Sequence, residues 1–291
     1  KRQKGDYSNM KQIQGGVTAA KGFEAASTAA GIKYKDRTDM ALVYSQVPCV
    51  AAGTFTTNVV KAAPVKWDQQ VVKSGAKAQA VVVNSGIANA CTGAEGFGYC
   101  KDTADAAAKA LNISADGVLI GSTGVIGKQI PIDKLTAGIE ALAGKKNDTL
   151  ENGTEAAKAI MTTDTFPKEL AVTIEVGGKT VTIGGMAKGS GMIHPNMCTM
   201  LAFITTDAVI TKDALQKAFA LDDSGFSGDM LSADSLNLEN AFRMGGDSLD
   251  LSGMINLDQI SLDVSGMPQM NLGDMIGSLD LTVKPGGMQK L

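Results

Sequence analysis

The chain has 291 residues, enough for about two average domains. Its 44% hydrophobic and 20% charged residues are typical of a folded globular protein. Lys and Arg total 27 against 30 Asp and Glu, and aromatic residues make up only 4%, so this balance argues against a nucleic-acid-binding protein. No apolar stretch approaches the roughly 20 residues of a membrane-spanning helix, and the basic start, Lys1-Arg2-Gln3-Lys4, lacks the apolar segment of a secretory signal. We expect a cytoplasmic protein that binds neither nucleic acid nor membrane.

Charge is unevenly distributed along the chain. Residues 221–291 hold three basic residues against ten Asp and one Glu, a net charge of −8, whereas residues 1–220 have a net charge of +5. Seven of the 14 Met also lie in 221–291. Short alternating stretches at 259–264 and 279–283 are compatible with loosely repetitive β structure and equally with disorder. The acidic segment therefore differs in character from the rest.

The four cysteines do not form a recognisable metal or disulfide framework. They lie at positions 49, 91, 100 and 198, without C-x-x-C spacing, and the chain has one His. A zinc site needs more ligands than this pattern offers. We expect free thiols in a reducing compartment, and no metal.

Hydrophobic periodicity predicts a mixed order of strands and helices. The continuous apolar strand at 78–83 is expected to be buried on both faces, 118–120 is expected to be a short buried strand, and Gly177-Gly178 predicts a two-residue hairpin turn. The predicted strands are 38–45, which Pro48 ends, 78–83, 118–120, 170–176, 179–183 and 200–204. The predicted helices are 65–76, 101–111, 133–143, with Asp133 as its N-cap and Gly144 just past its end, 154–161 and 212–221. This order predicts an α+β protein with a layered α/β fold.

Polar, glycine-punctuated stretches follow these predicted elements. Residues 84–93 form such a stretch after the first buried strand, where catalytic groups are common. After the second, Ser122-Thr123-Gly124 can present backbone N–H groups and the Thr123 hydroxyl to a developing oxyanion, although a tight strand-to-helix turn explains it too. Residues 160–168 crowd three hydroxyls and a carboxylate, which capping and turn hydrogen bonds explain equally well.

The richest chemical pattern is the loop and strand at 186–201. Its threonine, Thr199, can become an N-terminal nucleophile if its hydroxyl attacks the preceding carbonyl and water hydrolyses the resulting ester. The freed α-amino group has a pKa near 8, which suits a general base. Lys188 can hold a carboxylate or favour the neutral form of that amine by charge repulsion.

Other readings of this stretch stay open. An ordinary turn followed by a strand needs no chemistry from Thr199. Cys198 is a rival nucleophile, which burial would make unreactive. His194 is a candidate general base, but a lone His also serves as a hydrogen-bonding loop residue.

Four ordered motifs, taken together, resemble one family. They are Val82 to Gly93, Ser122 to Gly127, Met161 to Lys168 and Ala187 to Asp207. The family is the ornithine acetyltransferases, also called bifunctional glutamate N-acetyltransferases, of arginine biosynthesis. The resemblance covers about residues 15–220 and does not extend over 221–291.

The resemblance implies a precursor that cuts itself between Cys198 and Thr199, although family members usually have Ala where this chain has Cys198. It also implies that Thr123 and Gly124 form the oxyanion hole and that Thr165, Lys188 and Thr199 bind substrate. Thr199 would take acetyl from N-acetylornithine and pass it to glutamate. Some members also use acetyl-CoA as donor, and no metal or prosthetic group is needed. The processed chains would assemble into a heterotetramer.

The end of the resemblance divides the chain into three predicted regions. Residues 1–198 precede the cut, 199–220 begin the second chain with the nucleophile, and 221–291 form the acidic segment of unknown fold. The family's further glutamate and its closing motif are not found in 221–291, so we expect the C-terminal part of the fold to be truncated or replaced. Two alternatives follow: an inactive member whose acidic segment binds a partner, and an amidohydrolase that uses the same N-terminal threonine.

Overall fold

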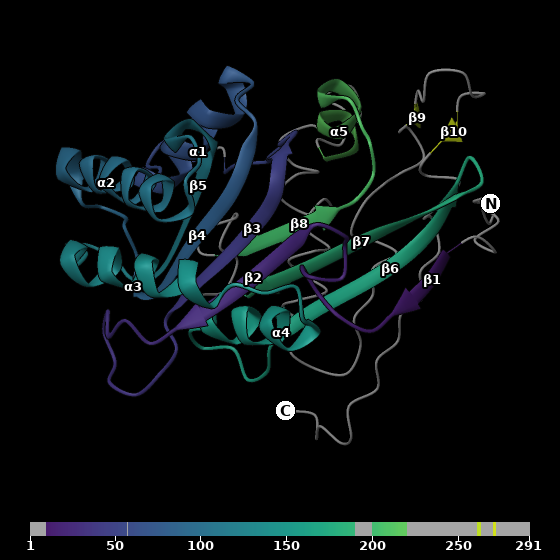
Figure 1. Cartoon of the computed structure of the whole chain (residues 1–291). Coiled ribbons are helices and arrows are strands. Elements are labelled where there is room, and N and C mark those ends of the chain that lie inside the picture. The colour runs from purple at the N-terminus through teal and green to yellow at the C-terminus, as the bar shows by residue number, and fades with distance from the viewer. Residues whose placement is uncertain (1–9, 57, 190–199, 220–260, 263–269, 272–291) are drawn as a thin grey trace, which may run out of the picture.

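The computed structural model describes residues 10–56, 58–189, 200–219, 261–262 and 270–271. Within these residues, two four-stranded sheets and the helices around them form the layered α+β fold that the sequence predicts (Figure 1). A two-stranded pair, β9 (Ser261–Leu262) and β10 (Met270–Asn271), belongs to the acidic segment. The rest of 221–291 lies outside the described residues.

The first sheet has the strand order β2-β3-β4-β5. Its neighbours pair antiparallel except β4 and β5, which run parallel. Both faces are buried, as predicted, because Val82 packs into one hydrophobic cluster and Val83 into another. The strands are β2 (Phe23–Thr28), β3 (Met40–Cys49), β4 (Ala78–Ile87) and β5 (Val118–Val125).

Helices cover both faces of this sheet. Three helices bury small and aliphatic side chains, such as Ala104 and Leu142, in the cluster that contains Val82. On the other face, Ala156 and Ala157 of a fourth helix pack in the cluster of Val83. The first three are α1 (Ala63–Ser74), α2 (Gly93–Leu111) and α3 (Ile132–Lys145), and the fourth is α4 (Leu150–Ala159).

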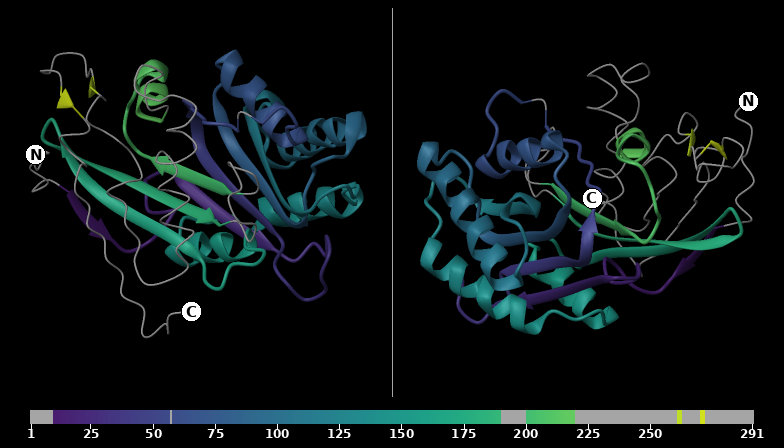
Figure 2. Two further views of the ribbon diagram at one scale, coloured as in Figure 1. Left: turned by 180° about the vertical axis from the view of Figure 1, so that it is seen from behind. Right: turned by 45° about the horizontal axis from the view of Figure 1, so that its top comes forward.

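The second sheet is antiparallel, in the order β1-β6-β7-β8. Gly177 and Gly178, with φ of +58° and +72°, form the predicted two-residue hairpin turn between β6 and β7. Met186 and Phe203 pack in the same cluster as Val83, so the two sheets share a core. Figure 2 shows α1, α2 and α3 on the side of the molecule away from this sheet. Its strands are β1 (Met10–Ile13), β6 (Lys168–Val176), β7 (Lys179–Lys188) and β8 (Leu201–Thr206).

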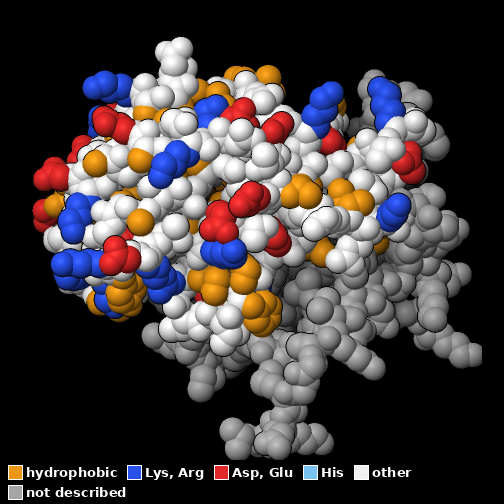
Figure 3. Space-filling model, turned by 60° about the horizontal axis from the view of Figure 1, so that its bottom comes forward, with side chains coloured by type: hydrophobic (Ala, Val, Ile, Leu, Met, Phe, Trp, Pro, Cys, Tyr) orange, Lys and Arg blue, Asp and Glu red, His pale blue; other side chains and the backbone are white. Residues whose placement is uncertain are grey.

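The last described helix, α5 (Lys212–Phe219), follows β8. Lys212 Nζ donates to the carbonyl of Val72 at 2.9 Å, at the end of α1. On the face shown in Figure 3, acidic, basic and hydrophobic side chains are interspersed, and neither charge forms a continuous field.

Several predicted boundaries are wrong, most importantly at the ends of β4 and β5. The stretch at 84–87 continues β4, because Asn84 Nδ2 donates to the carbonyl of Ile87 at 2.8 Å and Ser85 Oγ to that of Ala159 at 2.7 Å. These bonds let polar side chains stay buried in a strand. The extension places Ser85 and Gly86 beside Thr123 and Gly124 of β5.

Other boundary errors have simple causes. The β3 strand runs past Pro48 to Cys49, beyond an irregular stretch of the ladder where residues are exposed and a missing N–H costs little. Pro131, not Asp133, is the N-cap of α3, and this helix continues through Gly144 to Lys145. Helices α2 and α4 begin at residues 93 and 150 instead of 101 and 154, because glycine and polar residues near a helix start hide its periodicity. The small, alanine-rich strand β2 was not predicted.

Candidate active site

The end of β5 and the end of β7 meet at a buried lysine. Lys188, the last residue of β7, is 1% exposed, and its Nζ donates to the Oγ1 of Thr123 on β5 at 3.0 Å. Thr123 itself is fully buried. A buried ammonium needs hydrogen-bond partners to offset its loss of water, so this contact ties the two sheets together at a defined point.

The loop between α4 and β6 completes this cluster. Lys188 Nζ also donates to Thr162 Oγ1 at 2.8 Å. Asp164 Oδ1 accepts from Lys168 Nζ at 2.7 Å and from the backbone N–H of Gly189 at 2.8 Å. We refer to Thr123, Thr162, Asp164, Lys168 and Lys188 as the lysine–threonine cluster.

The cluster holds two cations and one anion at neutral pH. Burial lowers the pKa of Lys188 to about 8; the nearby Lys168 charge also lowers this pKa, while Asp164 opposes the change. Burial acts to raise the pKa of Asp164, but the hydrogen bond from Lys168 and the backbone N–H groups hold it below its ordinary value. One net positive charge remains beside Thr123, and such a charge favours an anion.

Gly124 follows Thr123 at a close approach of two backbones. Its φ is +132°, which side-chain-bearing residues rarely adopt, and it lies opposite Gly86 of β4. A Cβ on Gly124 would overlap the Gly86 backbone. Glycine is therefore required here.

The structure brings some predicted site residues together and leaves others undescribed. Thr123, Gly124 and Lys188 lie close together, whereas Thr165 is exposed on the loop that carries Asp164. His194, Cys198 and Thr199 lie outside the described residues.

Three cluster residues were missed as candidate site residues. Thr162, Asp164 and Lys168 all lie in or next to the polar stretch whose hydroxyls and carboxylate were noticed in the sequence. Turn hydrogen bonds do occur there, since Asp164 Oδ2 accepts from the Thr162 N–H at 3.2 Å. The carboxylate nonetheless also contacts Lys168 and Gly189, and the side chain of Asp164 is only 2% exposed.

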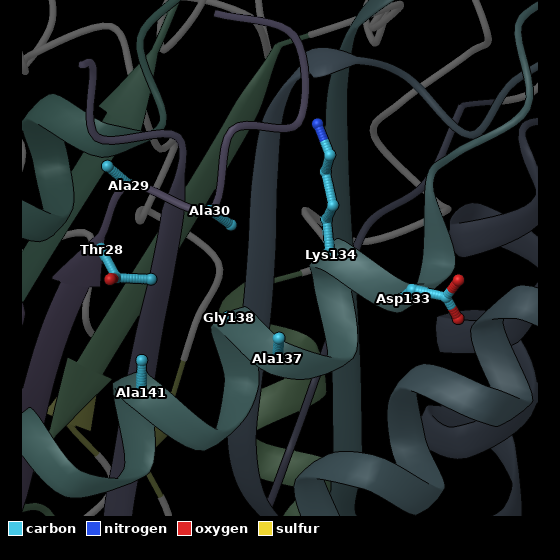
Figure 4. A pocket seen from close by; sticks show the side chains of 8 residues that line it. All are labelled: Thr28, Ala29, Ala30, Asp133, Lys134, Ala137, Gly138 and Ala141. Atoms are coloured by element: carbon cyan, nitrogen blue, oxygen red, sulfur yellow. The ribbon is translucent and has the colours of Figure 1, made fainter. Parts of the chain in front are cut away.

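Other chemical groups of the described residues lie apart from this cluster. Cys100 is fully buried, and burial raises the pKa of its thiol to about 12, which makes it a poor nucleophile. No group of His, Cys, Asp and Glu among the described residues is arranged to hold a metal ion. A shallow pocket on the outer side of α3 shares no residue with the cluster, and Figure 4 shows small side chains such as Ala137 and Ala141 facing it.

No helix in the described part of the chain is long and apolar enough to cross a membrane. The fold and the cluster define a two-sheet α+β protein with a buried lysine–threonine centre where the sheets meet. The model of the ArgJ family matches residues 24–234, and the chain belongs to this family. The predicted resemblance is thereby confirmed, and the match extends past residue 220, where the resemblance was expected to stop.

Curated relatives carry the name arginine biosynthesis bifunctional protein ArgJ. The chain is 53% identical over 211 residues to the protein from Symbiobacterium thermophilum, and the aligned region covers 72% of this chain and 52% of the relative. It is 49% identical over 213 residues to the protein from Gloeobacter violaceus, covering 73% and 52%. The chain thus spans about half the length of the curated relatives it matches.

Solved structures share the fold. The arginine biosynthesis bifunctional protein ArgJ from Bacillus halodurans superposes with a TM-score of 0.62 at 43% identity, covering 65% of this chain and 98% of that one. Ornithine acetyltransferase from Mycobacterium tuberculosis, solved in complex with ornithine, gives a TM-score of 0.60 at 45% identity, covering 67% of this chain and all of that one.

Proposed function

We propose that this chain carries the first half, and the start of the second half, of a cytoplasmic acetyltransferase of arginine biosynthesis. Its reaction moves an acetyl group from N2-acetylornithine to glutamate through an acetyl-Thr199 intermediate. The observation that carries this proposal is the buried contact of Lys188 with Thr123 beside Gly124, in a chain of the ArgJ family. The names of the relatives, which include an ornithine complex, support the substrate class.

Self-cleavage would create the nucleophile. The Thr199 hydroxyl attacks the carbonyl carbon of Cys198, the peptide C–N bond breaks to give an ester and a free α-amino group, and water hydrolyses the ester. Coverage of the solved relatives supports a cut in this region. The 65% of 291 residues that match, about 190 residues, cover 98% of the Bacillus halodurans chain, whereas the curated sequences are covered by only about half. A separate chain of that length agrees with a cut before Thr199.

Acetyl transfer would then proceed in two half-reactions. The Thr199 α-amine takes the hydroxyl proton while the hydroxyl oxygen attacks the acetyl carbonyl, and an oxyanion forms. Donors at Thr123 and Gly124 would stabilise this charge, helped by the net positive charge of the cluster. The intermediate collapses with loss of ornithine, which takes the proton from the α-ammonium. The amine of glutamate then attacks the acetyl ester and restores the Thr199 hydroxyl. Thr165, exposed next to Asp164, would contact substrate.

The remaining expectations belong to this proposal. Acetyl-CoA would serve as an alternative acetyl donor, and the chemistry needs no metal or prosthetic group. The processed chains would assemble into a heterotetramer. The described Cys49, Cys91 and Cys100 are free thiols, which agrees with a reducing compartment.

Intact mass spectrometry of the purified chain tests the proposal. Two fragments are expected, the smaller one beginning at Thr199, and Thr199→Ala should give a single uncut chain, whereas Thr199→Ser should still be cut. Acetyl exchange between N-acetylornithine and labelled ornithine tests the transfer. An uncut native chain that also lacks exchange would contradict the proposal.

The −8 net charge of residues 221–291 favours a second candidate, an inactive family member whose acidic segment binds a partner. Limited proteolysis separates the two: trimming between residues 221 and 230 that leaves exchange intact excludes a role for this segment in catalysis. A third candidate, the amidohydrolase, predicts hydrolysis of N-acetyl amino acids without any acceptor amine.

A further inference from the structure

The protonation state of Lys188 determines which atoms donate in the cluster. An ammonium has three hydrogens and no lone pair, so Thr123 Oγ1 and Thr162 Oγ1 must both accept from it. A threonine hydroxyl that accepts one hydrogen bond keeps its own hydrogen for a different partner. A neutral amine, by contrast, can accept that hydrogen and turn it toward itself.

Contact with a cation also strengthens the hydroxyl as a donor. Hydrogen bonds that involve an ionised group are stronger, and chains of hydrogen bonds polarise one another where water is excluded. Both conditions hold here, because Lys188 is 1% exposed and Thr123 is fully buried.

We propose that Lys188 is a positioning residue that acts through Thr123: its ammonium directs the hydroxyl hydrogen of Thr123 toward the oxyanion that forms in acyl transfer, and Asp164, itself held by Lys168, fixes the backbone around the ammonium. The reaction rests on the proposed function, whereas the contact between Lys188 and Thr123 is independent of it.

Asp164 fits the supporting role by geometry and by charge, and Lys168 fixes Asp164 through a hydrogen bond of 2.7 Å. Through one carboxylate, Asp164 binds the backbone N–H of Gly189, directly after Lys188, and that of Thr162, whose hydroxyl Lys188 contacts. These are also the charged groups of the described residues that act on Lys188, and their effects oppose each other: Lys168 favours the neutral amine and Asp164 the ammonium.

A double-mutant cycle on the rate of self-cleavage and of acetyl exchange separates action through Thr123 from independent action. Thr123→Val and Lys188→Met should each slow the reaction about 10²-fold, the loss seen when one oxyanion donor is removed. The double variant should be no slower than either single variant. Multiplied losses would overturn the proposal, because Lys188 would then act without Thr123.

The pH profile provides a signature that a merely structural role would not produce. The rate should fall at alkaline pH as Lys188 loses its proton. Lys168→Met should move this fall to higher pH, and Asp164→Asn to lower pH, each by about one unit. Lys158→Met, which removes an exposed lysine paired with Glu155 on α4, is the matched control and should not move the profile. Shifts in the same direction, or none, would contradict the proposal.

A measurement on the uncut chain keeps the inference separate from the proposed function. The Lys188 side-chain amine can be titrated by heteronuclear NMR, with its signal assigned through Lys188→Arg. Thr123→Val removes one acceptor of the ammonium, so the titration midpoint should fall, whereas Thr123→Ser should leave it in place. An unchanged midpoint in Thr123→Val would refute the contact even if the native chain neither cuts itself nor transfers acetyl.

Discussion

The two four-stranded sheets treat buried polar groups differently. In β2-β3-β4-β5, buried polar side chains such as Asn84 and Ser85 donate to backbone carbonyls and thereby complete the fold. In β1-β6-β7-β8, the buried groups include the charged Lys168 and Lys188, which lie together at the open end of the β6–β7 hairpin. Buried charge is costly and is retained chiefly where chemistry uses it. At the junction of the two sheets, the first sheet therefore supplies a closely packed backbone and the second supplies charge.

The close approach of β4 and β5 in the first sheet can be tested at Gly124. Gly124→Ala should cost about 4 kcal/mol of unfolding free energy, because the new Cβ would overlap Gly86 and sit at an unfavourable φ. Gly127→Ala is the control: its φ is also positive, at +72°, but no atom lies within 4 Å of the new Cβ. Urea denaturation should show a loss of only about 1 kcal/mol for the control. Equal losses would contradict the close approach of β4 and β5.

The core beneath the first sheet should respond more strongly than the outer edge of the second. Leu142→Ala removes a fully buried side chain of α3 and should cost about 3 kcal/mol. Ile204→Ala, on β8 at the edge of the other sheet, truncates a side chain that is 41% exposed and should cost about 1 kcal/mol. Thermal unfolding of both variants checks the ranking, and a reversed order would show that the second sheet carries more of the core.

The charge of the second sheet should appear in the pH dependence of stability. Burial lowers the pKa of Lys188 from 10.5 to about 8, so the folded state bears the cost of a buried ammonium below that range. The unfolded chain binds the proton more tightly, and stability therefore rises with pH between these two values. Relative to Lys188→Met, the free energy of unfolding of the native chain should rise by about 2–3 kcal/mol across this interval. If the free energies of unfolding of the native chain and Lys188→Met changed in parallel with pH, Lys188 would not be a buried ammonium.

An exposed ion pair should contribute least. Lys101 pairs with Asp105 one turn away on α2, with side chains 66% and 51% exposed. Lys101→Met should leave the free energy of unfolding unchanged within the error of a denaturation curve, at low and at high salt, because both side chains remain in contact with water. A clear, salt-resistant loss of unfolding free energy would show that this exposed charge affects stability in the way expected only of the buried charges.

Much of the fold could be predicted from periodicity, because its elements bury continuous or regularly spaced apolar residues. The hairpin at Gly177-Gly178 was located because only a few turn types join two strands through two residues. The extension of β4 through Asn84 and Ser85 was missed, since their acceptors are carbonyls whose positions only the folded chain defines. Helix boundaries were missed for the related reason that caps depend on local hydrogen bonds.

The candidate site could be predicted only in part. Thr123, Gly124 and Lys188 were candidates from the residue pattern and from the family resemblance, and the structure brings them together. Asp164 and Lys168 were not proposed, because capping and turn hydrogen bonds explain the polar stretch at 160–168 equally well. Their significance comes from burial and from the Gly189 N–H, which depend on how β6 and β7 meet.

The ladder between β7 and β8 has a consequence for a chain that is cut. Six registered residue pairs, from Ile183 with Thr206 to Lys188 with Leu201, join these two strands by backbone hydrogen bonds. If the chain were cut between β7 and β8, the two resulting polypeptides would therefore still share this sheet. Covalent continuity is not what keeps Lys188 beside the start of β8.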